Sequence, residues 1–329
     1  MPQPDTTHLY DKQSSVVFYD ERYANGWMDE WPIEKKRRLA ELLQGFGLPA
    51  QGEALDFGCG NGVFTDVIRE ALPGWKVYGM DISANAIANA RERYPKCTFF
   101  VASDPELAGR RFDFVHTHHV LEHVYNLAQV LDDVNSRLKD RVNVLHILPC
   151  GNAGSLEDQI CRLRTDGINP QAENRCFFED HGHLRRMTTA QMIQLCQAYD
   201  LHLVQQHYSN QYHGAVDWIT MSRPGFVQML TGTETAVDDA ARAKLRALRR
   251  KLLLLRNLRL AAMVVEDKLR KRRRTLRDYL ILLLALPLYP LAKPVDLQIK
   301  AKHADEWEHH RAEPNGSEMY LFFQRPGKA

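Results

Sequence analysis

The chain has few cysteines, and none of them form a closely spaced pair. The six cysteines stand at positions 59, 97, 150, 161, 176 and 196, so no two are separated by only two residues. This spacing argues against a disulfide framework and a zinc knuckle, and it is typical of a reducing compartment. The opening residues, MPQPDTTHLYDKQSS, lack a basic stretch followed by an apolar one. We therefore expect no signal peptide and a cytoplasmic protein.

The sequence also lacks an apolar run long enough to cross a membrane. The run YLILLLALPLYPLA, from Tyr279 to Ala292, has fourteen residues and contains two prolines. A membrane-spanning helix needs about 20 apolar residues. We therefore expect this segment not to cross a bilayer.

Two common phosphate-binding motifs are absent. The segment LDFGCGNG carries Gly58, Gly60 and Gly62, but Val63 stands where a GxGxxG dinucleotide motif has its third glycine. No Gly-Lys-Ser or Gly-Lys-Thr of a phosphate loop occurs. A glycine cluster after an apolar run nevertheless predicts a strand, a tight turn and a helix, whose backbone can approach a nucleotide closely.

Acidic residues lie at the ends of the first two predicted strands and just after the third. Asp56 precedes the glycines, Asp81 ends VYGMD, and Asp104 follows FVAS. An acid in front of the glycines would repel a pyrophosphate but suits an ammonium group. An acid ending the second strand can accept hydrogen bonds from both ribose hydroxyls, and Asp104 can accept one from an adenine amino group. The three acids predict an adenosyl ligand without phosphates.

Strands and helices alternate from about residue 52 onward. Short apolar segments predict strands: EALDF, KVYGMD, CTFFVAS, FDFVHT, VNVLHIL, LHLVQQHY and, at the end of the chain, SEMYLFFQRP. Helical spacing occurs between them, in TDVIREAL, ANAIANARERY, LAQVLDDVNSRL and TTAQMIQLCQAY. This alternation predicts an α/β fold with a mainly parallel sheet and helices on both faces.

Five segments together resemble the motif series of class I S-adenosylmethionine-dependent methyltransferases: LDFGCGNG, MDIS, FVASDPEL, FDFVHTHHVLEHV and GHLRRMTTAQM. The resemblance covers roughly residues 50–210 and the final strand. It is greatest for the branch with ubiquinone-biosynthesis, glycan and natural-product O-methyltransferases. It implies a seven-stranded, Rossmann-like, doubly wound sheet with an antiparallel last strand, and an α-helical insertion between strands six and seven. It also implies S-adenosyl-L-methionine as cofactor.

The same resemblance implies which residues bind the cofactor. The methionine moiety would lie over Gly58 and Gly60 with Asp56 near its amino group, and the ribose would lie on Asp81. The adenine would lie between Ile82 and Asp104. The complete implied set is Asp56, Gly58, Cys59, Gly60, Asn61, Gly62, Asp81, Ile82, Asp104 and His116. An alternative for Asp56 or Asp104 is a helix cap, and Cys59 is read as a small turn residue rather than a nucleophile.

Several histidines are candidates for a catalytic base. Methyl transfer to oxygen or nitrogen requires an aligned acceptor and often a base for its proton. The segment HTHHVLEHV offers His118, His119 and His123, and HGHLRRMT offers His181. His119-x-x-Glu122-His123 resembles the E-x-x-E-H motif that ubiquinone-type enzymes associate with a divalent metal, with His replacing the first Glu. Metal binding and a scaffold role for the cofactor loop stay open as alternatives, but we predict no metal.

Charge is strongly segregated along the chain. Residues 241–277 hold fifteen Lys or Arg against two acids, whereas the remainder holds 28 basic and 39 acidic residues. Leucine-rich segments accompany the basic ones, which favours a peripheral membrane foot touching anionic headgroups and an amphiphilic acceptor. Dimerisation or lid formation through the leucines is an alternative, and so is an RNA-binding arm. The RNA alternative is weakened because polar and aromatic residues are not interleaved with the charges.

These patterns divide the chain into four predicted parts. They are an N-terminal helical cap or lid (1–50), a cofactor-binding core (51–213), a basic and apolar helical insertion (214–312) and a final core strand (313–329). Within the first part, Tyr19, Tyr23, Trp27 and Trp31 recur every fourth residue, which predicts either a packed helix face or a lid. The segment from Pro149 to Asp180 reads as a long loop that forms an acceptor wall.

The sequence thus predicts a methyltransferase that acts on oxygen of a glycan, lipid-linked or other amphiphilic small molecule at a membrane surface. The alternatives are an RNA methyltransferase that uses the basic insertion and a soluble small-molecule methyltransferase that dimerises through it.

Overall fold

The computed structural model describes residues 12–271 and 273–327. The chain forms two compact units. The first comprises Met1–Pro149, Asp180–Gln206 and Tyr320–Ala329, and the second comprises Cys150–Glu179 and His207–Met319. Each unit is described by itself below. The four-part division drawn from the sequence stays a prediction.

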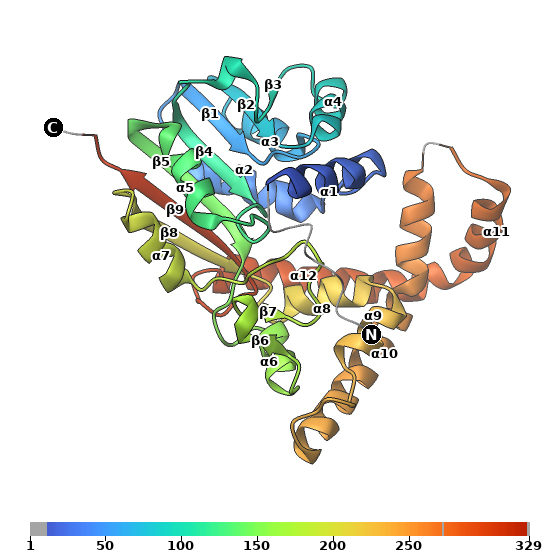
Figure 1. The fold of residues 1–329 in the computed structure, drawn as a ribbon. Coiled ribbons are helices and arrows are strands. Elements are labelled where there is room, and N and C mark those ends of the chain that lie inside the picture. Colours follow the sequence, from blue (N-terminus) through green and yellow to red (C-terminus); the bar gives the residue numbers. More distant parts are fainter. Residues whose placement is uncertain (1–11, 272, 328–329) are drawn as a thin grey trace. The chain divides into compact units, whose positions relative to one another are not determined.

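Seven strands form one mixed sheet (Figure 1). They are β1 (Gly52–Phe57), β2 (Trp75–Asp81), β3 (Thr98–Val101), β4 (Phe112–His118), β5 (Leu138–Pro149), β8 (His202–Ser209) and β9 (Glu318–Arg325). The strand order is β3-β2-β1-β4-β5-β9-β8; β1 to β5 pair in parallel and the last strands are antiparallel. In the described part of the chain between β8 and β9 lie the α-helices α8 to α12. The predicted Rossmann-like fold with a helical insertion is therefore confirmed.

Six helices belong to the first unit: α1 (Lys12–Ala24), α2 (Ile33–Gly45), α3 (Val63–Ala71), α4 (Ala84–Arg93), α5 (Leu127–Ser136) and α7 (Thr189–Gln197). Helix α3 begins directly after Gly62 and buries Val63, Phe64 and Ile68. Helix α4 begins where the Ser83 hydroxyl accepts a hydrogen bond from the Ala86 N–H. Both helices follow the strands that carry Asp56 and Asp81, which lie at or near the ends of β1 and β2.

The N-terminal aromatic residues do not share one helix. Tyr19 and Tyr23 lie in α1 and are buried, but α1 ends at Ala24. Trp27 lies in the turn beyond Gly26, whose φ is +78°. The expectation of four aromatics on one helical face is therefore wrong for Trp27 and Trp31, because a left-handed glycine ends the helix.

The second unit is mainly helical. It contains α6 (Leu156–Arg162), α8 (His213–Met221), α9 (Pro224–Leu230), α10 (Asp239–Arg270), α11 (Leu276–Ala285), α12 (Tyr289–His310) and a small hairpin of β6 (Ile168–Asn169) with β7 (Arg175–Cys176). Its core includes Ile160, Ile219, Val227 and Leu252, all fully buried.

The segment from Pro149 to Asp180 is not the long loop that the sequence suggested. It contains α6 and the β6–β7 hairpin. Ser155 caps α6 by accepting a hydrogen bond from the Asp158 N–H, and Leu156 and Ile160 are buried in the core of the second unit. Short apolar elements supported by distant neighbours are difficult to recognise in sequence, which explains the error.

One helical stretch, Leu276–His310, is long and apolar enough to cross a membrane by length and composition alone. Its most apolar window has a mean hydropathy of 1.6 and is 17% buried. The sequence had suggested that this region is too short to cross. The stretch is longer than the apolar run Tyr279–Ala292, because helix α12 continues beyond that run to His310.

Candidate active site

The glycine loop follows β1 and has a conformation that other residues rarely adopt. Gly58, Gly60 and Gly62 have φ values of +75°, +51° and +80°. A Cβ on Gly58 would lie 2.5 Å from Val120 Cγ2, and one on Gly60 would lie 2.6 Å from the Tyr23 hydroxyl. The loop therefore needs glycine both for its backbone angles and for its close neighbours.

A cavity of about 400 Å³ lies beside this loop, in the first unit. One part of its wall consists of Gly58, Asp81, Ile82 and Ala102. The rest comes from α1, the residues that follow it, and the segment from β4 into α5. Those side chains include Tyr19, Tyr23, Trp27, His119, Val120, His123, Val124, Tyr125, Gln129, Val130, Asp133 and Arg137. Its mixed apolar and polar lining is typical of a small-molecule site.

Asp81 is the buried acid of this cavity. Its two carboxylate oxygens accept hydrogen bonds from the Gly60 N–H at 2.8 Å and the Ser83 N–H at 2.9 Å. Burial raises the pKa of Asp81 to about 6, although these hydrogen bonds oppose the rise. The carboxylate thus lies at the end of β2 between the glycine loop and α4, as a ribose-binding acid requires.

Asp56 lies in the interior beneath the loop and is not part of the cavity lining. Its register in the sheet places it opposite His116 on β4. His116 Nδ1 lies 2.8 Å from Asp56 Oδ1, and the Thr65 hydroxyl donates to Oδ2 at 2.7 Å. Both carboxylate oxygens are thus paired with protein groups. The assignments of Asp56 to the methionine amino group and of His116 to the cofactor stay predictions.

The other implied cofactor residues have varied surroundings. Cys59 is buried, and burial raises the pKa of its thiol well above the usual range, which agrees with a turn residue rather than a nucleophile. The Asn61 amide donates to the Trp27 carbonyl and to Asp29. Asp104 caps a short 3-10 helix by accepting from the Glu106 N–H. Ala102, not Asp104, lines the cavity.

His119 lies on the cavity wall with a carboxylate behind it. Its φ is +53°, in the left-handed region. His119 Nδ1 lies 2.7 Å from Glu122 Oε1, and Nε2 lies 3.3 Å from Lys35 Nζ. Burial opposes ionisation of Glu122, but the neighbouring imidazoles of His119, His123 and His183 outweigh it and lower its pKa to about 2. An ionised Glu122 only accepts hydrogen bonds, so it holds the proton of His119 on Nδ1.

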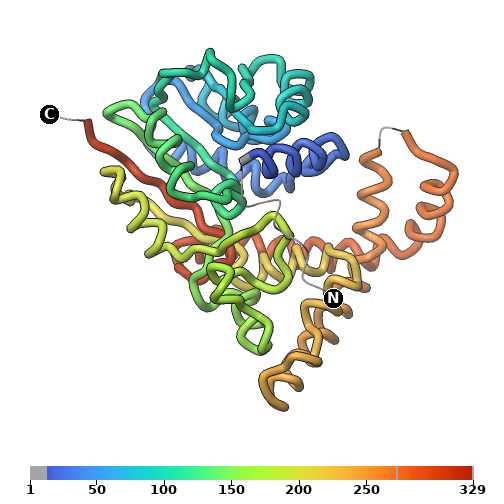
Figure 2. The backbone as a smooth tube through the Cα atoms, viewed as in Figure 1, coloured from blue at the N-terminus to red at the C-terminus, as the bar shows by residue number. Residues whose placement is uncertain are grey.

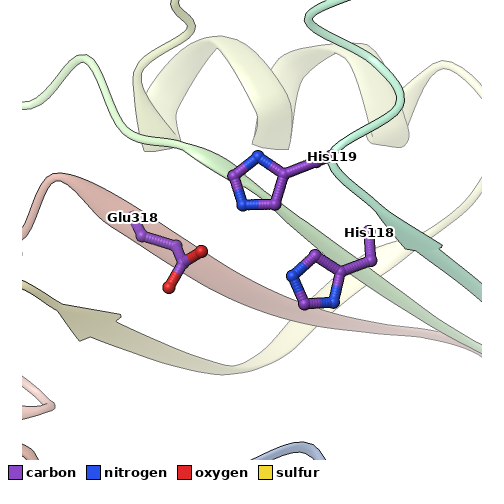
Figure 3. A group of neighbouring side chains, drawn as sticks. All are labelled: His118, His119 and Glu318. Atoms are coloured by element: carbon purple, nitrogen blue, oxygen red, sulfur yellow. The ribbon is translucent and has the colours of Figure 1, made fainter. Parts of the chain in front are cut away.

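The buried ring of His118 stacks on the ring of His119, with centroids 5.0 Å apart. It also stacks on Phe64 with ring centroids 3.9 Å apart and lies 5.1 Å from the Trp31 ring. Figure 3 shows His118 and His119 leaving consecutive positions at the end of β4, and it also draws Glu318, the first residue of β9. The cavity wall includes His119 and not His118, so the two candidate bases differ in access to a ligand.

His123 and His183 form a second group with Glu122. The rings of His123 and His183 pack edge to face, with centroids 4.5 Å apart. Each of the three residues also offers one possible metal-ligand atom, and these three atoms lie within 4.8 Å of one another. Burial and the His183 imidazole lower the pKa of His123 to about 4. These donors are of the type that transition ions bind, so the metal alternative stays open at this place.

His181 and His183 differ in their surroundings, which the sequence could not show. His181 is exposed and does not line the cavity, whereas His183 packs against His123. The assignment of His181 as a base stays a prediction without geometric support. The sequence pattern HGH marked both residues equally.

Helix α1 covers the cavity and is held by two polar contacts. Arg22 makes a bidentate pair with Asp180, with both distances 2.8 Å. The Asp20 carboxylate accepts from the Ser83 hydroxyl and from Asn85. Tyr19 and Trp27 contact the ring of His123. The lid role of the helix stays a prediction.

Helix α5 and residues flanking both of its ends add a wall that sequence reasoning missed. Tyr125, Gln129, Asp133 and Arg137 all line the cavity. Their spacing of four residues places them on one helical face, which is the signal that could have identified them.

Comparisons with known proteins give the family of the chain. The sequence profile of a family described as a methyltransferase domain matches residues 31–206. Trans-aconitate 2-methyltransferase of Rhodopseudomonas palustris (strain HaA2) is 39% identical over 70 residues, or 21% of this chain and 27% of that protein. Ribosomal RNA small subunit methyltransferase C of Alcanivorax borkumensis is 31% identical over 86 residues, 26% of this chain and 25% of that protein. The chain thus spans about a quarter of the length of these curated relatives.

One solved structure is similar in backbone fold to part of this chain. Magnesium protoporphyrin IX methyltransferase from Synechocystis PCC 6803, with bound S-adenosylhomocysteine, has a TM-score of 0.44 and 17% identity. The matched region covers 61% of this chain and 95% of the chain of that methyltransferase.

Proposed function

The chain belongs to the methyltransferase domain family, and from this premise we propose which acceptor it methylates and which residue takes the proton. It is an S-adenosylmethionine-dependent methyltransferase with S-adenosyl-L-methionine as cofactor. Each turnover therefore converts the sulfonium cofactor to S-adenosylhomocysteine.

The proposed acceptor is a hydroxyl group on an amphiphilic small molecule, such as a glycan or lipid-linked compound, used at the cytoplasmic surface of a membrane. The apolar part of the cavity wall supports it, because Tyr23, Val120, Val124 and Val130 offer hydrocarbon surface beside His119. The exposed leucine-rich helices of the second unit support the membrane location.

The proposed base is His119. Its side chain lies on the cavity wall, and Glu122 holds the proton on Nδ1. Nε2 is then the basic nitrogen. In the structure this atom is within reach of the Lys35 ammonium, so acceptor binding would replace the lysine at this position. The bond from sulfur to the methyl carbon breaks as the new O–CH3 bond forms, and the acceptor proton moves to Nε2.

The observation that carries this proposal is that Gly58, Asp81 and His119 line the same cavity. Glu122, which is not in the lining, lies 2.7 Å from His119 Nδ1. Such a cavity can hold a cofactor and an acceptor hydroxyl together, which is the alignment that methyl transfer requires.

The test uses S-adenosylmethionine with a labelled methyl group and three acceptor pools: a membrane lipid extract, a water-soluble metabolite extract and total RNA. We expect label in the lipid extract. Label confined to RNA or to the water-soluble pool would replace the proposed acceptor with one of the two alternatives.

The base assignment needs a matched pair of variants. We expect His119→Ala to lower kcat by about 10²–10⁴-fold while S-adenosylhomocysteine affinity changes little. His181→Ala, a histidine that is exposed and outside the cavity lining, serves as control and should keep full activity. Normal kcat in the His119 variant, or a loss in the His181 variant, would contradict the assignment.

A further inference from the structure

The second unit exposes an unusual amount of leucine at one place. Leu276, Leu283, Leu284 and Leu291 each expose between 69% and 77% of their surface. They lie in α11 and at the start of α12, within a stretch where Tyr279, Leu280, Leu286 and Leu288 are also exposed. We call the exposed apolar side chains of residues 276–291 the leucine tip. Contiguous apolar surface of this kind marks an interaction site.

An apolar groove adjoins the leucine tip. The groove lies between α10 and the segment that contains α11 and the start of α12, and its volume is about 410 Å³. Figure 2 shows how the chain turns back between α10 and α12. Its lining is Asn257, Leu258, Leu260, Ala261, Val264, Ile281, Leu284, Ala285, Leu288, Leu291 and Ala292. Asn257 is the one polar residue in this lining, so the groove offers hydrocarbon a place without hydrogen-bonding requirements.

Cationic side chains lie directly before the leucine tip in the chain. Lys268 and Lys271 are within ion-pair distance of Asp278, which also caps the N-terminus of α11. Arg270, Arg273 and Arg277 are exposed, and among residues 12–271 and 273–327 no ion pair involves them. A ligand of the tip therefore meets three guanidinium groups without a carboxylate partner.

The combination of leucines and cations decides which partner fits. A second copy of the chain would cover the leucines but would bring identical cations to the same edge, which repel each other. A nucleic acid would neutralise the cations but leave the leucines in water. An anionic phospholipid leaflet supplies hydrocarbon and negative headgroups together.

We propose that the leucine tip docks into the surface of an anionic phospholipid membrane, with its leucines in the outer hydrocarbon region and Arg270, Arg273 and Arg277 at the headgroups. This inference deepens the membrane location in the proposed function and names the docking element and the lipid class. It does not depend on which acceptor is methylated.

The tip enters the membrane surface without crossing the bilayer. The apolar run Tyr279–Ala292 has fourteen residues, which as a helix would extend about 21 Å, and a bilayer core is about 30 Å thick. Beyond that run, α12 returns to the interior of the second unit. Asp296 is 1% exposed there and accepts a hydrogen bond from the Arg259 guanidinium.

Vesicle flotation tests the proposal on the full chain. The vesicles are phosphatidylcholine alone and phosphatidylcholine mixed with phosphatidylglycerol, each at low and high salt. We expect flotation with the mixed vesicles that salt weakens but does not abolish. Arg273→Ser combined with Arg277→Ser should lower partition onto mixed vesicles by roughly 25-fold, because each basic residue near such a surface contributes about fivefold.

Two leucine variants separate docking from misfolding. The tip variant combines Leu283→Asp with Leu284→Asp. The control variant combines Leu254→Asp in α10 with Leu297→Asp in α12; these two leucines are 59% and 51% exposed and lie outside the leucine tip. We expect only the tip variant to stop flotation. S-adenosylhomocysteine affinity and circular dichroism should be unchanged in both, which confirms folding and shows that cofactor binding is independent of docking.

Several results would overturn the proposal. One is absence of flotation by the unaltered protein, and another is equal flotation by the tip and control variants. A third is a concentration-dependent dimer, without vesicle binding, that the tip variant dissociates; this would make a second copy the partner. None of these results bears on methyl transfer, which the labelled-methyl assay measures separately.

Discussion

At the scale of single residues, three similar acids have three different surroundings. Asp56 is buried under the loop with His116 and Thr65, Asp81 lines the cavity, and Asp104 caps a short helix. Each follows a strand in the sequence, so the pattern alone gives them equal weight. Burial and access to the cavity make Asp81 the acid that a bound ribose would reach.

We expect Asp81→Asn to weaken S-adenosylhomocysteine binding by about tenfold or more, because ribose hydroxyls donate to an ionised carboxylate and a charged acceptor forms the stronger hydrogen bond. Titration calorimetry measures the change. Asp104→Asn is the matched control and should have a smaller effect, since Asp104 does not line the cavity. Unaltered affinity in the Asp81 variant would contradict the ribose assignment.

The pH dependence of binding follows from the same residue. Burial raises the pKa of Asp81 to about 6, so the empty site holds a proton below this pH. If only the ionised form binds ribose, affinity should rise by about tenfold between about pH 5 and pH 7. In the absence of ligand the sign is opposite: a raised carboxyl pKa makes the folded state lose stability as pH rises from about 4 to about 6. Asp81→Asn should remove the contribution of Asp81 to the pH dependence of binding and to the pH dependence of stability. A variant whose binding affinity changes with pH as in the unaltered protein would refute the prediction.

At the scale of elements, α1 lines the cavity and is tied to the segment around Asp180. Arg22 reaches Asp180, 158 positions further along the chain, and Tyr19 and Trp27 lie against His123. Burial raises the pKa of the Asp180 carboxyl. The hydrogen bonds from Arg22 and from the Gly182 N–H outweigh this effect and lower the pKa to about 2. The contact therefore persists across the physiological pH range.

We expect Arg22→Ala to speed release of S-adenosylhomocysteine several-fold, because the lid loses a bidentate tie that holds it closed. Stopped-flow measurement of dissociation tests this. Arg162→Ala removes an exposed ion pair with Asp158 in α6 of the second unit and serves as control. Equal release rates in both variants would show that α1 is a static part of the wall.

A second element-scale prediction concerns α10, whose Arg259 is completely buried. Its guanidinium pairs with Asp217 and Asp296 and donates to the Thr220 hydroxyl. Burial raises the pKa of Asp217, but the hydrogen bond from His303 and the Arg259 charge outweigh it, so the pKa lies below the usual range. The paired acids thus stay ionised inside the second unit.

We expect Arg259→Met to destabilise the second unit by about 3–5 kcal/mol, because Asp217 and Asp296 lose the buried guanidinium that they share. Asp217 then keeps His303 as a partner, and Asp296 keeps Lys300. Denaturant unfolding measures the loss. The control is Arg256→Met on the same helix, whose arginine donates only to the Ser222 carbonyl and should cost much less. Similar losses in the two variants would contradict a special role for the buried network.

At the scale of the whole molecule, the cofactor cavity lies in the first unit and the leucine tip lies in the second. The charge segregation follows the same division, since residues 241–277, which hold fifteen basic and two acidic residues, belong to the second unit. The proposed methyl transfer and the proposed membrane contact can therefore be changed separately.

Saturating S-adenosylhomocysteine should stabilise the first unit. At a ligand concentration about 100 times Kd, mass action adds about 2.7 kcal/mol to the free energy of unfolding. Scanning calorimetry should show this upward shift in the unaltered protein and in the leucine tip variant, and a smaller shift in Asp81→Asn. A shift that disappears in the tip variant would show that the two functions are coupled.

The sequence by itself determined the elements that depend on near neighbours in the chain. The glycine loop, the strand–helix alternation, the helical insertion before the last strand and the cofactor class all follow from local patterns, because turns need particular backbone angles and helices need spaced apolar residues. These patterns are complete within a few positions, so no distant residue is needed to recognise them.

Only the tertiary structure decided which of these residues meet. The pairing of Asp56 with His116 joins positions 60 apart, and the grouping of His183 rather than His181 with His123 depends on how the segment after Asp180 packs. The same holds for the closure of α1 over the cavity and for the helices between Pro149 and Asp180. Sheet register and side-chain packing create these contacts between distant positions, and no local pattern in the sequence records them.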